Sequence, residues 1–139
     1  MNALAIHLYL RYYYINLNFN NFGIFYRTIE YYKLKDENGV CQFDEFCAEI
    51  KQNAADKKLL PYIWKYMEML TDRQMLPEEK FNHVEGIARD DVFEFKKKSL
   101  RVYVIKQKPD VFVIMGGYKK EQKKDIARIK KFIKDMKIT

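Results

Sequence analysis

Two cations five residues apart, Lys96 and Arg101, are the side chains whose types and spacing best suit chemistry. If Lys98 and Ser99 form a two-residue link between strands, Lys96 lies directly opposite Arg101. Like charges that face each other across strands destabilise a sheet by a few tenths to about 1 kcal/mol unless an anion joins them. The pair therefore predicts a site for an anionic group. The alternative is a surface ion network in which Glu94 neutralises both cations diagonally.

The C-terminal third is more basic than the rest of the chain. The 139 residues carry a net charge of +7, and residues 91–139 alone hold 15 Lys and Arg against 6 Asp and Glu. A one-sided positive field of this kind attracts phosphate backbones, acidic protein segments or anionic membrane surfaces. The alternative is a solvated, lysine-rich surface without a partner.

Length and composition fit one globular domain. The chain is 48% apolar with 5 Gly and 3 Pro, which excludes collagen-like and low-complexity classes, and its length suffices for one core. Residues 1–22 show no clear period and are interpreted as an irregular, non-essential extension, so residues 23–139 form the domain. The two cysteines, Cys41 and Cys47, fit no zinc or redox motif, so we expect reduced thiols in a cytoplasmic protein.

The N-terminal region does not read as a membrane or export signal. The longest uncharged stretch, from Tyr12 to Tyr26, contains four asparagines and is too short and too polar to cross a membrane. Arg11 follows the apolar run of the N-terminus and does not precede it, unlike the positive charge of a signal peptide.

The apolar spacing predicts a small α+β domain with an antiparallel-rich, four-stranded sheet packed with helices, in the order β-α-α-β-β-β-α. The first strand is expected from Ile24 to Leu34. Helical spacing predicts two helices, from Asp44 to about Asn53 and from Asp56 to before Asp72. Residues 75–90 are expected to be irregular, and Gly116-Gly117 to end the sheet. The remaining predicted elements are three strands and a final helix: Val92–Lys96, Leu100–Lys106, Val111–Met115 and Glu121–Met136.

Two links set the register of the last three strands. One is Lys98-Ser99 and the other is a four-residue link over 107–110, and the further pairs expected from them are Phe95–Val102, Glu94–Tyr103, Val104–Val113 and Val102–Met115. Alternation then places apolar side chains on one side, as a bed for the helices. The other side carries Glu94, Lys96, Arg101 and Tyr103.

The segment from Val92 to Lys123 resembles the RelE/HigB superfamily of type II toxins, especially its phage-derived HigB-like branch. That branch has an aromatic-Glu-Leu-Arg strand, a hairpin, an Arg-Val/Ile-aromatic strand, and an apolar strand that runs into Gly-aromatic-x-Lys-Lys-x-Gln-Lys. The counterparts here are Phe93-Glu94-Phe95-Lys96, Arg101-Val102-Tyr103-Val104 and Val113-Ile114-Met115-Gly116-Gly117-Tyr118-Lys119-Lys120-Glu121-Gln122-Lys123. The chain departs from the pattern in having lysine at position 96 and Lys124-Asp125 where a proline often follows.

The resemblance implies a ribosome-dependent, metal-independent endoribonuclease that cleaves mRNA in the decoding site. Such cleavage needs a base for the 2′-OH, cations for the phosphate and an acid for the leaving 5′-oxygen. Lys96 is the candidate base, because crowding by cations lowers the pKa of a lysine. Arg101 is the candidate phosphate clamp, because its donors form a fixed fork. Lys119 and Lys120 are candidates to hold the phosphate or protonate the leaving group.

Aromatic and basic residues around this set are candidates for RNA contacts. Tyr118 or Tyr103 could stack on a splayed base, although Tyr118 is equally interpreted as a core aromatic whose hydroxyl reaches water. A catalytic His83 is a weaker hypothesis, because it precedes the strand in the irregular segment, and His7 is assigned nothing. The other basic residues are expected to attract phosphates collectively: Lys97, Lys98, Lys123, Lys124 and Arg128.

Two rival functions were weighed. A metal-dependent nuclease is suggested by Pro109-Asp110 followed by Glu121 and Lys123, but its chemistry needs the Glu and Lys on a strand beside the aspartate, so we expect no metal and no cofactor. The non-enzymatic rival is a ParE-like toxin that binds gyrase, or a basic RNA-binding module. Asp90-Asp91 is interpreted as a turn.

The expected partners follow from the resemblance and the charge. They are mRNA, the ribosome and a cognate DNA-binding antitoxin, with no membrane. The antitoxin must screen the basic region, so an acidic, partly disordered segment that folds on binding is expected.

Overall fold

The computed structural model describes residues 30–71, 75–107 and 110–138, and the backbone of three earlier strands. Those strands are β1 (Ala5–His7), β2 (Ile15–Asn18) and β3 (Ile24–Arg27). The later elements are β4 (Tyr31–Leu34), α1 (Gln42–Ile50), α2 (Ala54–Lys57), α3 (Leu60–Thr71), β5 (Phe81–His83), β6 (Val92–Lys97), β7 (Leu100–Gln107), β8 (Asp110–Tyr118), the 3₁₀ turn η1 (Lys119–Glu121) and α4 (Gln122–Asp135).

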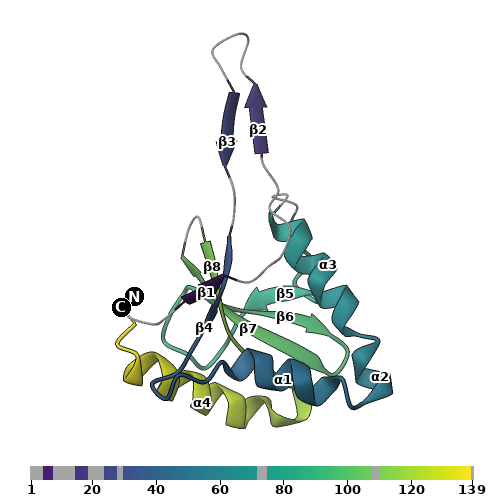
Figure 1. Ribbon diagram of the computed structural model, residues 1–139, viewed down its shortest axis with the longest axis vertical. Coiled ribbons are helices and arrows are strands. Elements are labelled where there is room, and N and C mark those ends of the chain that lie inside the picture. The colour runs from purple at the N-terminus through teal and green to yellow at the C-terminus, as the bar shows by residue number, and fades with distance from the viewer. Residues whose placement is uncertain are drawn as a thin grey trace.

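The main sheet is mixed, with the strand order β1-β4-β8-β7-β6-β5 (Figure 1). β4 runs parallel to β8 and the other neighbours are antiparallel, while β2 and β3 pair separately. The α+β class is confirmed, but the sheet is wider than the predicted four strands. The single strand predicted over 24–34 is divided into β3 and β4. β5 lies in a segment expected to be irregular, because three residues are too few to show alternation.

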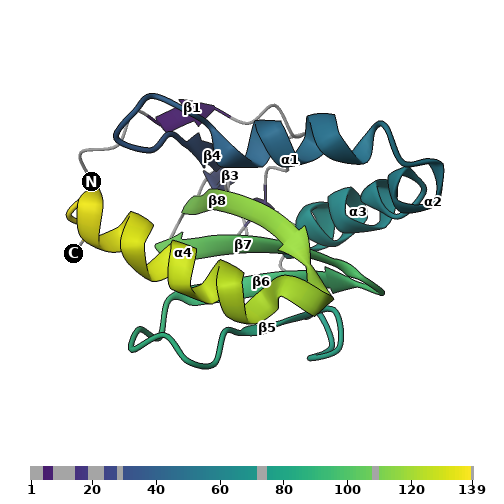
Figure 2. The ribbon, with the colours of Figure 1, turned by 90° about the horizontal axis from the view of Figure 1, so that it is seen from below.

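Helices cover both faces of the sheet (Figure 2). Phe43 of α1 and Ile63 of α3 belong to one buried cluster with Phe95, whereas Ile129 of α4 belongs to another with Tyr103. The predicted apolar bed for α1 and α3 is therefore present. The opposite face carries Glu94, Lys96, Arg101 and Tyr103 as predicted, but α4 packs over this face and buries Arg101 and Tyr103.

The hairpin register at the predicted anion pair is confirmed. Lys96 pairs with Arg101, Phe95 with Val102 and Glu94 with Tyr103, across a two-residue link in which Lys98 has a φ of 50°. Between β7 and β8, the pair Val104–Val113 is confirmed. Val102 faces Gly116 and not Met115, because the register shifts between Tyr103 and Val104, and Met115 belongs to the cluster under α4. Of the second link, Lys108 and Pro109 lie outside the described residues.

Gly116 and Gly117 lie inside β8 and do not end the sheet as predicted. Successive residues of a strand face opposite sides, and a Cβ at Gly116 would lie 1.9 Å from the Phe46 ring of α1. A Cβ at Gly117 would lie 2.0 Å from Oδ2 of Asp125 on α4. The two glycines therefore let helices approach both faces of the same strand closely.

The helices begin near their predicted starts, with different capping residues. α1 begins after Cys41, so Asp44 lies in its first turn and does not cap it. The second predicted helix is two: Asn53 caps α2 by accepting the backbone N–H groups of Ala55 and Asp56, and α3 follows with Pro61 in its first turn.

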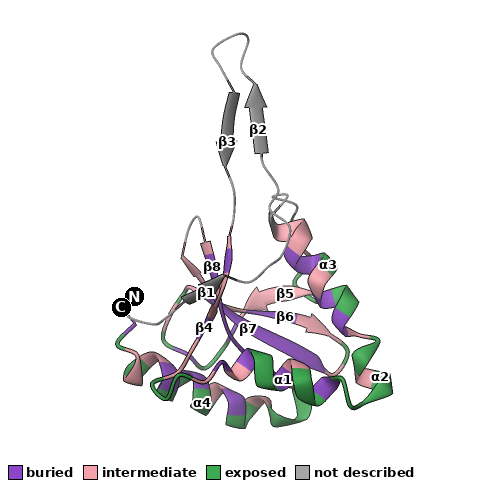
Figure 3. Ribbon diagram, in the orientation of Figure 1, coloured by how far each residue is buried: buried purple, intermediate pink, exposed green. Residues whose placement is uncertain are grey.

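Burial follows this layering (Figure 3). β7 is buried over most of its length, whereas the outward residues of α1 and α4 are exposed. Both thiols, Cys41 and Cys47, are free. Among the described residues, no helix has the length and apolar character needed to cross a membrane.

The close approach at Gly116 predicts a steric coupling with α1. Gly116→Ala should lower the free energy of unfolding by about 1–3 kcal/mol, because the buried Phe46 ring must move. Combined with Phe46→Leu, the same substitution should cost much less than the sum of the two single changes. Urea denaturation of the four proteins of this cycle measures the coupling, and strictly additive effects would contradict the packing described.

Candidate functional site

The turn between β6 and β7 meets the end of β8, and this junction gathers lysines that are distant in sequence. The backbone N–H of Lys119 donates to the carbonyl of Ser99 at 2.8 Å. A hollow of about 930 Å³ opens here, lined on this side by Lys98, Ser99, Tyr118, Lys119 and Lys120. The structure therefore brings together four of the predicted site residues: Lys98, Tyr118, Lys119 and Lys120.

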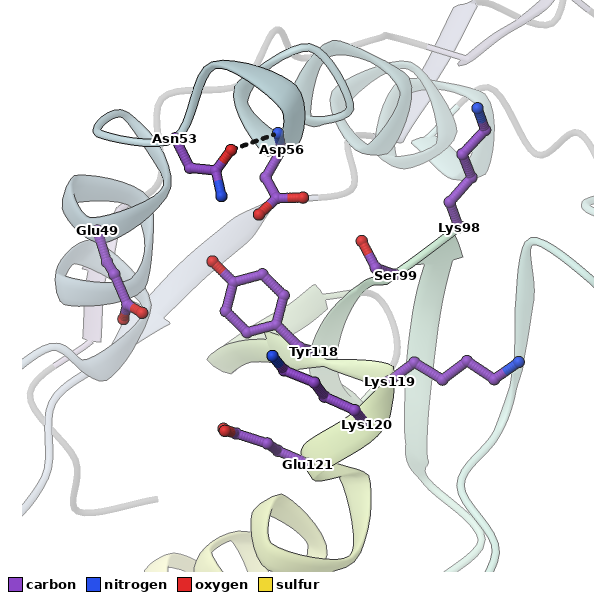
Figure 4. A pocket seen from close by; sticks show the side chains of 9 residues that line it. All are labelled: Glu49, Asn53, Asp56, Lys98, Ser99, Tyr118, Lys119, Lys120 and Glu121. Atoms are coloured by element: carbon purple, nitrogen blue, oxygen red, sulfur yellow. Dashed lines mark hydrogen bonds between the residues drawn. The ribbon is translucent and has the colours of Figure 1, made fainter.

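The side chains of the hollow point in different directions (Figure 4). The Tyr118 ring extends into the hollow toward Asp56, and Lys120 lies alongside it, while Lys98 and Lys119 point away toward solvent. Tyr118 is half-buried and meets the Phe46 ring edge to face, with ring centroids 5.5 Å apart. This placement fits the interpretation of Tyr118 as a core aromatic, since the ring packs on Phe46 and the hydroxyl reaches the hollow, whereas stacking on a base stays a prediction.

Carboxylates also line this hollow, and no sequence motif indicated them. They are Glu49 of α1, Asp56 of α2 and Glu121 of η1. Burial first, and then the negative charges of Asp56, Glu49 and Glu121, raise the pKa of Tyr118 above its usual value. The phenol therefore stays protonated at neutral pH and is available as a hydrogen-bond donor. One local feature of the sequence bears on the position of Asp56. Asn53 caps α2 and accepts the backbone N–H of Asp56, which places Asp56 in the first turn of that helix.

Arg101, the predicted phosphate clamp, is buried and not at the surface. Its residue is 7% exposed, and Nη1 donates to the carbonyls of Lys98 and Leu100 at 2.7 and 2.8 Å. Nε lies 3.9 Å from Oε1 of Glu94, so Glu94 does face Arg101, but in a buried pair and not in the predicted surface network with both cations. The guanidinium thus holds the β6–β7 turn in place, including the strained backbone of Lys98.

Lys96, the predicted base, lies on the face of Arg101 but does not line the hollow. Lys96 belongs to β6, the neighbour of β5, and its side chain is half-buried. The backbone N–H of Lys96 donates to the carbonyl of Lys80. Lys97 projects its ammonium over the Tyr62 ring, 4.1 Å from the centroid. Tyr103 is fully buried under α4, so its ring is not available at the surface for the predicted stacking on a base.

The outer side of α4 carries the remaining predicted RNA contacts. Lys123, Lys124 and Arg128 are exposed. Arg128 is partly engaged, because it donates to Oε1 of Gln42 at 3.1 Å and lies 3.6 Å from Oδ1 of Asp125. In the part of the chain that the structure describes, Lys123 and Lys124 form no ion pair and remain available to an anion.

The inner side of α4 covers buried polar groups. Glu94 accepts a hydrogen bond from Nε2 of Gln122 at 2.6 Å, and burial raises its pKa, although Arg101 and Lys96 act in the opposite direction. Asp125 is buried against Gly117, and burial raises its pKa as well, opposed by Arg128. Oδ2 of Asp125 and the Tyr103 hydroxyl have no hydrogen-bond partner among the described residues.

The residues weighed for rival chemistry are separated or engaged. Asp110 and Glu121 lie at opposite ends of β8, so the proposed metal-nuclease pattern is not assembled. Nε2 of His83 contacts the carbonyl of Arg89, whose guanidinium pairs with Asp91 at 2.7 Å. No three metal-ligating side chains come together among the residues that the structure describes.

No protein-family model, curated protein or solved structure matches this chain. The resemblance noted over Val92 to Lys123 therefore rests on those residues alone.

Burial of Arg101 predicts that it contributes to stability whatever it does in function. Arg101→Ala should lower the free energy of unfolding by about 3 kcal/mol, because it strips hydrogen bonds from two carbonyls and leaves Glu94 buried without its partner. Lys96→Ala is the matched control on the facing strand and should cost about 0.5 kcal/mol or less. Equal stability of the two variants in urea denaturation would contradict the buried position of Arg101.

The raised pKa of Asp125 predicts a pH-dependent cost of folding. A carboxyl whose pKa is higher in the folded than in the unfolded state binds more protons when folded, so its contribution to stability is lost as the pH rises above about 4. Asp125→Asn removes this dependence. The free energy of unfolding of the wild type, minus that of the variant, should fall with rising pH. A flat or rising difference between pH 4 and 8 would show that Asp125 is not penalised by burial.

Proposed function

We propose that this chain is a toxin of the RelE/HigB type, an endoribonuclease that cleaves ribosome-bound mRNA and is silenced by an acidic, DNA-binding antitoxin. The observation that carries the proposal is the meeting of Lys98 with Lys119 and Lys120 beside Tyr118. Four residues from two separate parts of the resembling segment thereby lie at one hollow. The exposed lysines of α4 continue the positive surface away from it.

The positive surface supports RNA as the substrate. Lys98, Lys119 and Lys120 are exposed, and none forms an ion pair among the described residues. An RNA backbone laid from this junction along α4 would meet Lys123 and Lys124 next, and each phosphate neutralised adds to affinity without regard to sequence.

The chemistry assigned to the hollow differs from that expected of Lys96 and Arg101. Asp56 points toward Tyr118 and supplies a carboxylate, which is a general base for the 2′-OH. Lys120, which lies alongside the Tyr118 ring, stabilises the charge that develops on the phosphate, and Lys119 extends the positive surface at the rim of the hollow. The protonated Tyr118 hydroxyl is the donor for the leaving 5′-oxygen, and its raised pKa keeps that proton in place before the reaction. Arg101 acts from beneath, by fixing the turn that carries Lys98.

Translation in vitro tests this proposal. Wild-type protein added to a ribosomal translation system should cleave mRNA, with 5′ ends mapped by primer extension, and should leave the same mRNA intact without ribosomes. The double variant Lys119→Ala/Lys120→Ala should cleave about 100-fold more slowly, and Tyr118→Phe roughly tenfold more slowly. Thermal unfolding should be unchanged in both, because these side chains are exposed or at the edge of the core.

The matched control is Lys51→Ala/Lys65→Ala, which removes two exposed lysines from the α1–α3 side of the chain. Its net charge equals that of the Lys119/Lys120 variant, and its cleavage rate should stay within about twofold of wild type. An equal loss in both double variants would reduce the effect to net charge. Intact transcripts together with accumulated cleaved DNA–gyrase complexes would favour the ParE-like alternative.

A further inference from the structure

A second hollow of about 660 Å³ lies on the other side of the start of α4. Its lining comes from the segment around β5, from β6 and from the first turns of α4. Glu94 reaches it from the sheet, and Lys123 and Lys130 stand on the helix. Because Lys120 and Glu121 line the first hollow and Gln122 and Lys123 line this one, the two hollows flank the same turn of chain.

The sheet side of this hollow presents hydrogen-bond acceptors. Glu94 is 4% exposed; its Oε2 accepts one hydrogen bond from Gln122 and its Oε1 lies 3.9 Å from Nε of Arg101, so each oxygen keeps a lone pair for a further donor. Oδ1 of Asn82 is buried and has no hydrogen-bond partner among the described residues, while Nδ2 of Asn82 donates to the carbonyl of His83. A carboxylate and an amide oxygen at one place match a ligand with paired donors, because unpaired buried acceptors cost free energy.

The helix side of the hollow offers an apolar surface and positive charges, which suit the base and the phosphate of a nucleotide. Ile126 is half-buried and supplies an apolar wall, and Lys123 and Lys130 are exposed cations. A planar base against Ile126, with its phosphate at a lysine, would use both kinds of side chain.

Hydrogen-bond geometry selects among the four bases. Guanine presents two adjacent donors, N1–H and N2–H₂, which one carboxylate can accept together. Adenine and cytosine present an amino group beside a ring acceptor, which would face the carboxylate with like polarity, and uracil presents one N–H between two carbonyls. A site built to accept paired donors rejects bases that lack them.

We propose that this second hollow binds a guanine base of the RNA strand, with Glu94 accepting its N1–H and N2–H₂ donors. The inference rests on the proposed function for the presence of RNA and adds a base preference to it. The strand would run from the first hollow over the start of α4, so that the guanine lies next to the nucleotides held by Lys119 and Lys120.

Fluorescence anisotropy with short labelled RNAs tests the base preference. The probes are a hexauridine with one guanosine and a hexauridine with one adenosine at the same position. The wild type should bind the guanosine probe roughly tenfold more tightly. Glu94→Gln, with its fold checked by circular dichroism, should bring the two affinities within about twofold of each other and leave the adenosine probe unchanged.

Two further variants separate recognition from a disturbance of the buried pair. Ala127→Phe fills the hollow from an exposed position of α4 and should also abolish the preference without touching Arg101. Glu78→Gln makes the same chemical change at an exposed site outside the hollow and should keep the wild-type preference. A preference that persists in both Glu94→Gln and Ala127→Phe would overturn the proposal.

The remaining outcomes distinguish this proposal from the proposed function. Equal binding of both probes by the wild type, with both weakened by Lys119→Ala/Lys120→Ala, would overturn the guanine site and leave RNA binding intact. If neither probe binds, direct binding of guanosine and adenosine 5′-monophosphates to the protein decides. A guanosine preference that Glu94→Gln removes would support the site as a nucleotide site and refute RNA binding, whereas equal or absent binding would overturn the site as well.

Discussion

The contact between α4 and β8 at Gly117 is the constraint on which the rest of this structure depends. Without a Cβ at that position, the carboxylate of Asp125 lies directly against the strand, and α4 can cross the face that carries Glu94, Arg101 and Tyr103. On the opposite face, the absence of a Cβ at Gly116 likewise leaves room for the Phe46 ring of α1. Two successive residues without side chains thus set the distance of a helix on each side of the sheet, and both hollows border the chain that leaves this strand.

The packing of α4 over that face changes which partners its charged side chains have. Lys96 and Arg101 face each other across β6 and β7, which would cost free energy on an open sheet. The structure relieves the repulsion internally, because Arg101 turns to the carbonyls of its own hairpin and to Glu94. Water is excluded there, so the two hydrogen bonds to the carbonyls and the ion pair with Glu94 are stronger, and the loss of any one partner is more costly than at the surface. Around this covered face, the turn, the end of β8 and the outer side of α4 carry lysines that remain exposed to an external anion.

The first hollow combines charges of both signs, and this mixture suits catalysis better than simple anion capture. A purely cationic hollow would hold a phosphate but offer no acceptor for a proton. Here α1 and α2 contribute carboxylates opposite the lysines of the sheet edge, with the Tyr118 phenol between them. The same carboxylates raise the pKa of that phenol. In the proposed mechanism, the acid and the base would therefore be coupled through one set of electrostatic interactions.

The sequence by itself determined the α+β class, the basic C-terminal third and the pairing of Lys96 with Arg101, because these follow from local periodicity and from a two-residue link. It also indicated where Lys119 and Lys120 leave the last strand. Only the tertiary structure decided that α4 buries Arg101 and Tyr103, that β4 lies parallel to β8, and that Asp56 lies near Tyr118. The physical reason is that alternation along a strand tells which residues share a face, whereas what covers that face depends on contacts between residues far apart in the chain. A glycine pair reads locally as a break, and only the helices packed against it on both sides show why it stands within a strand.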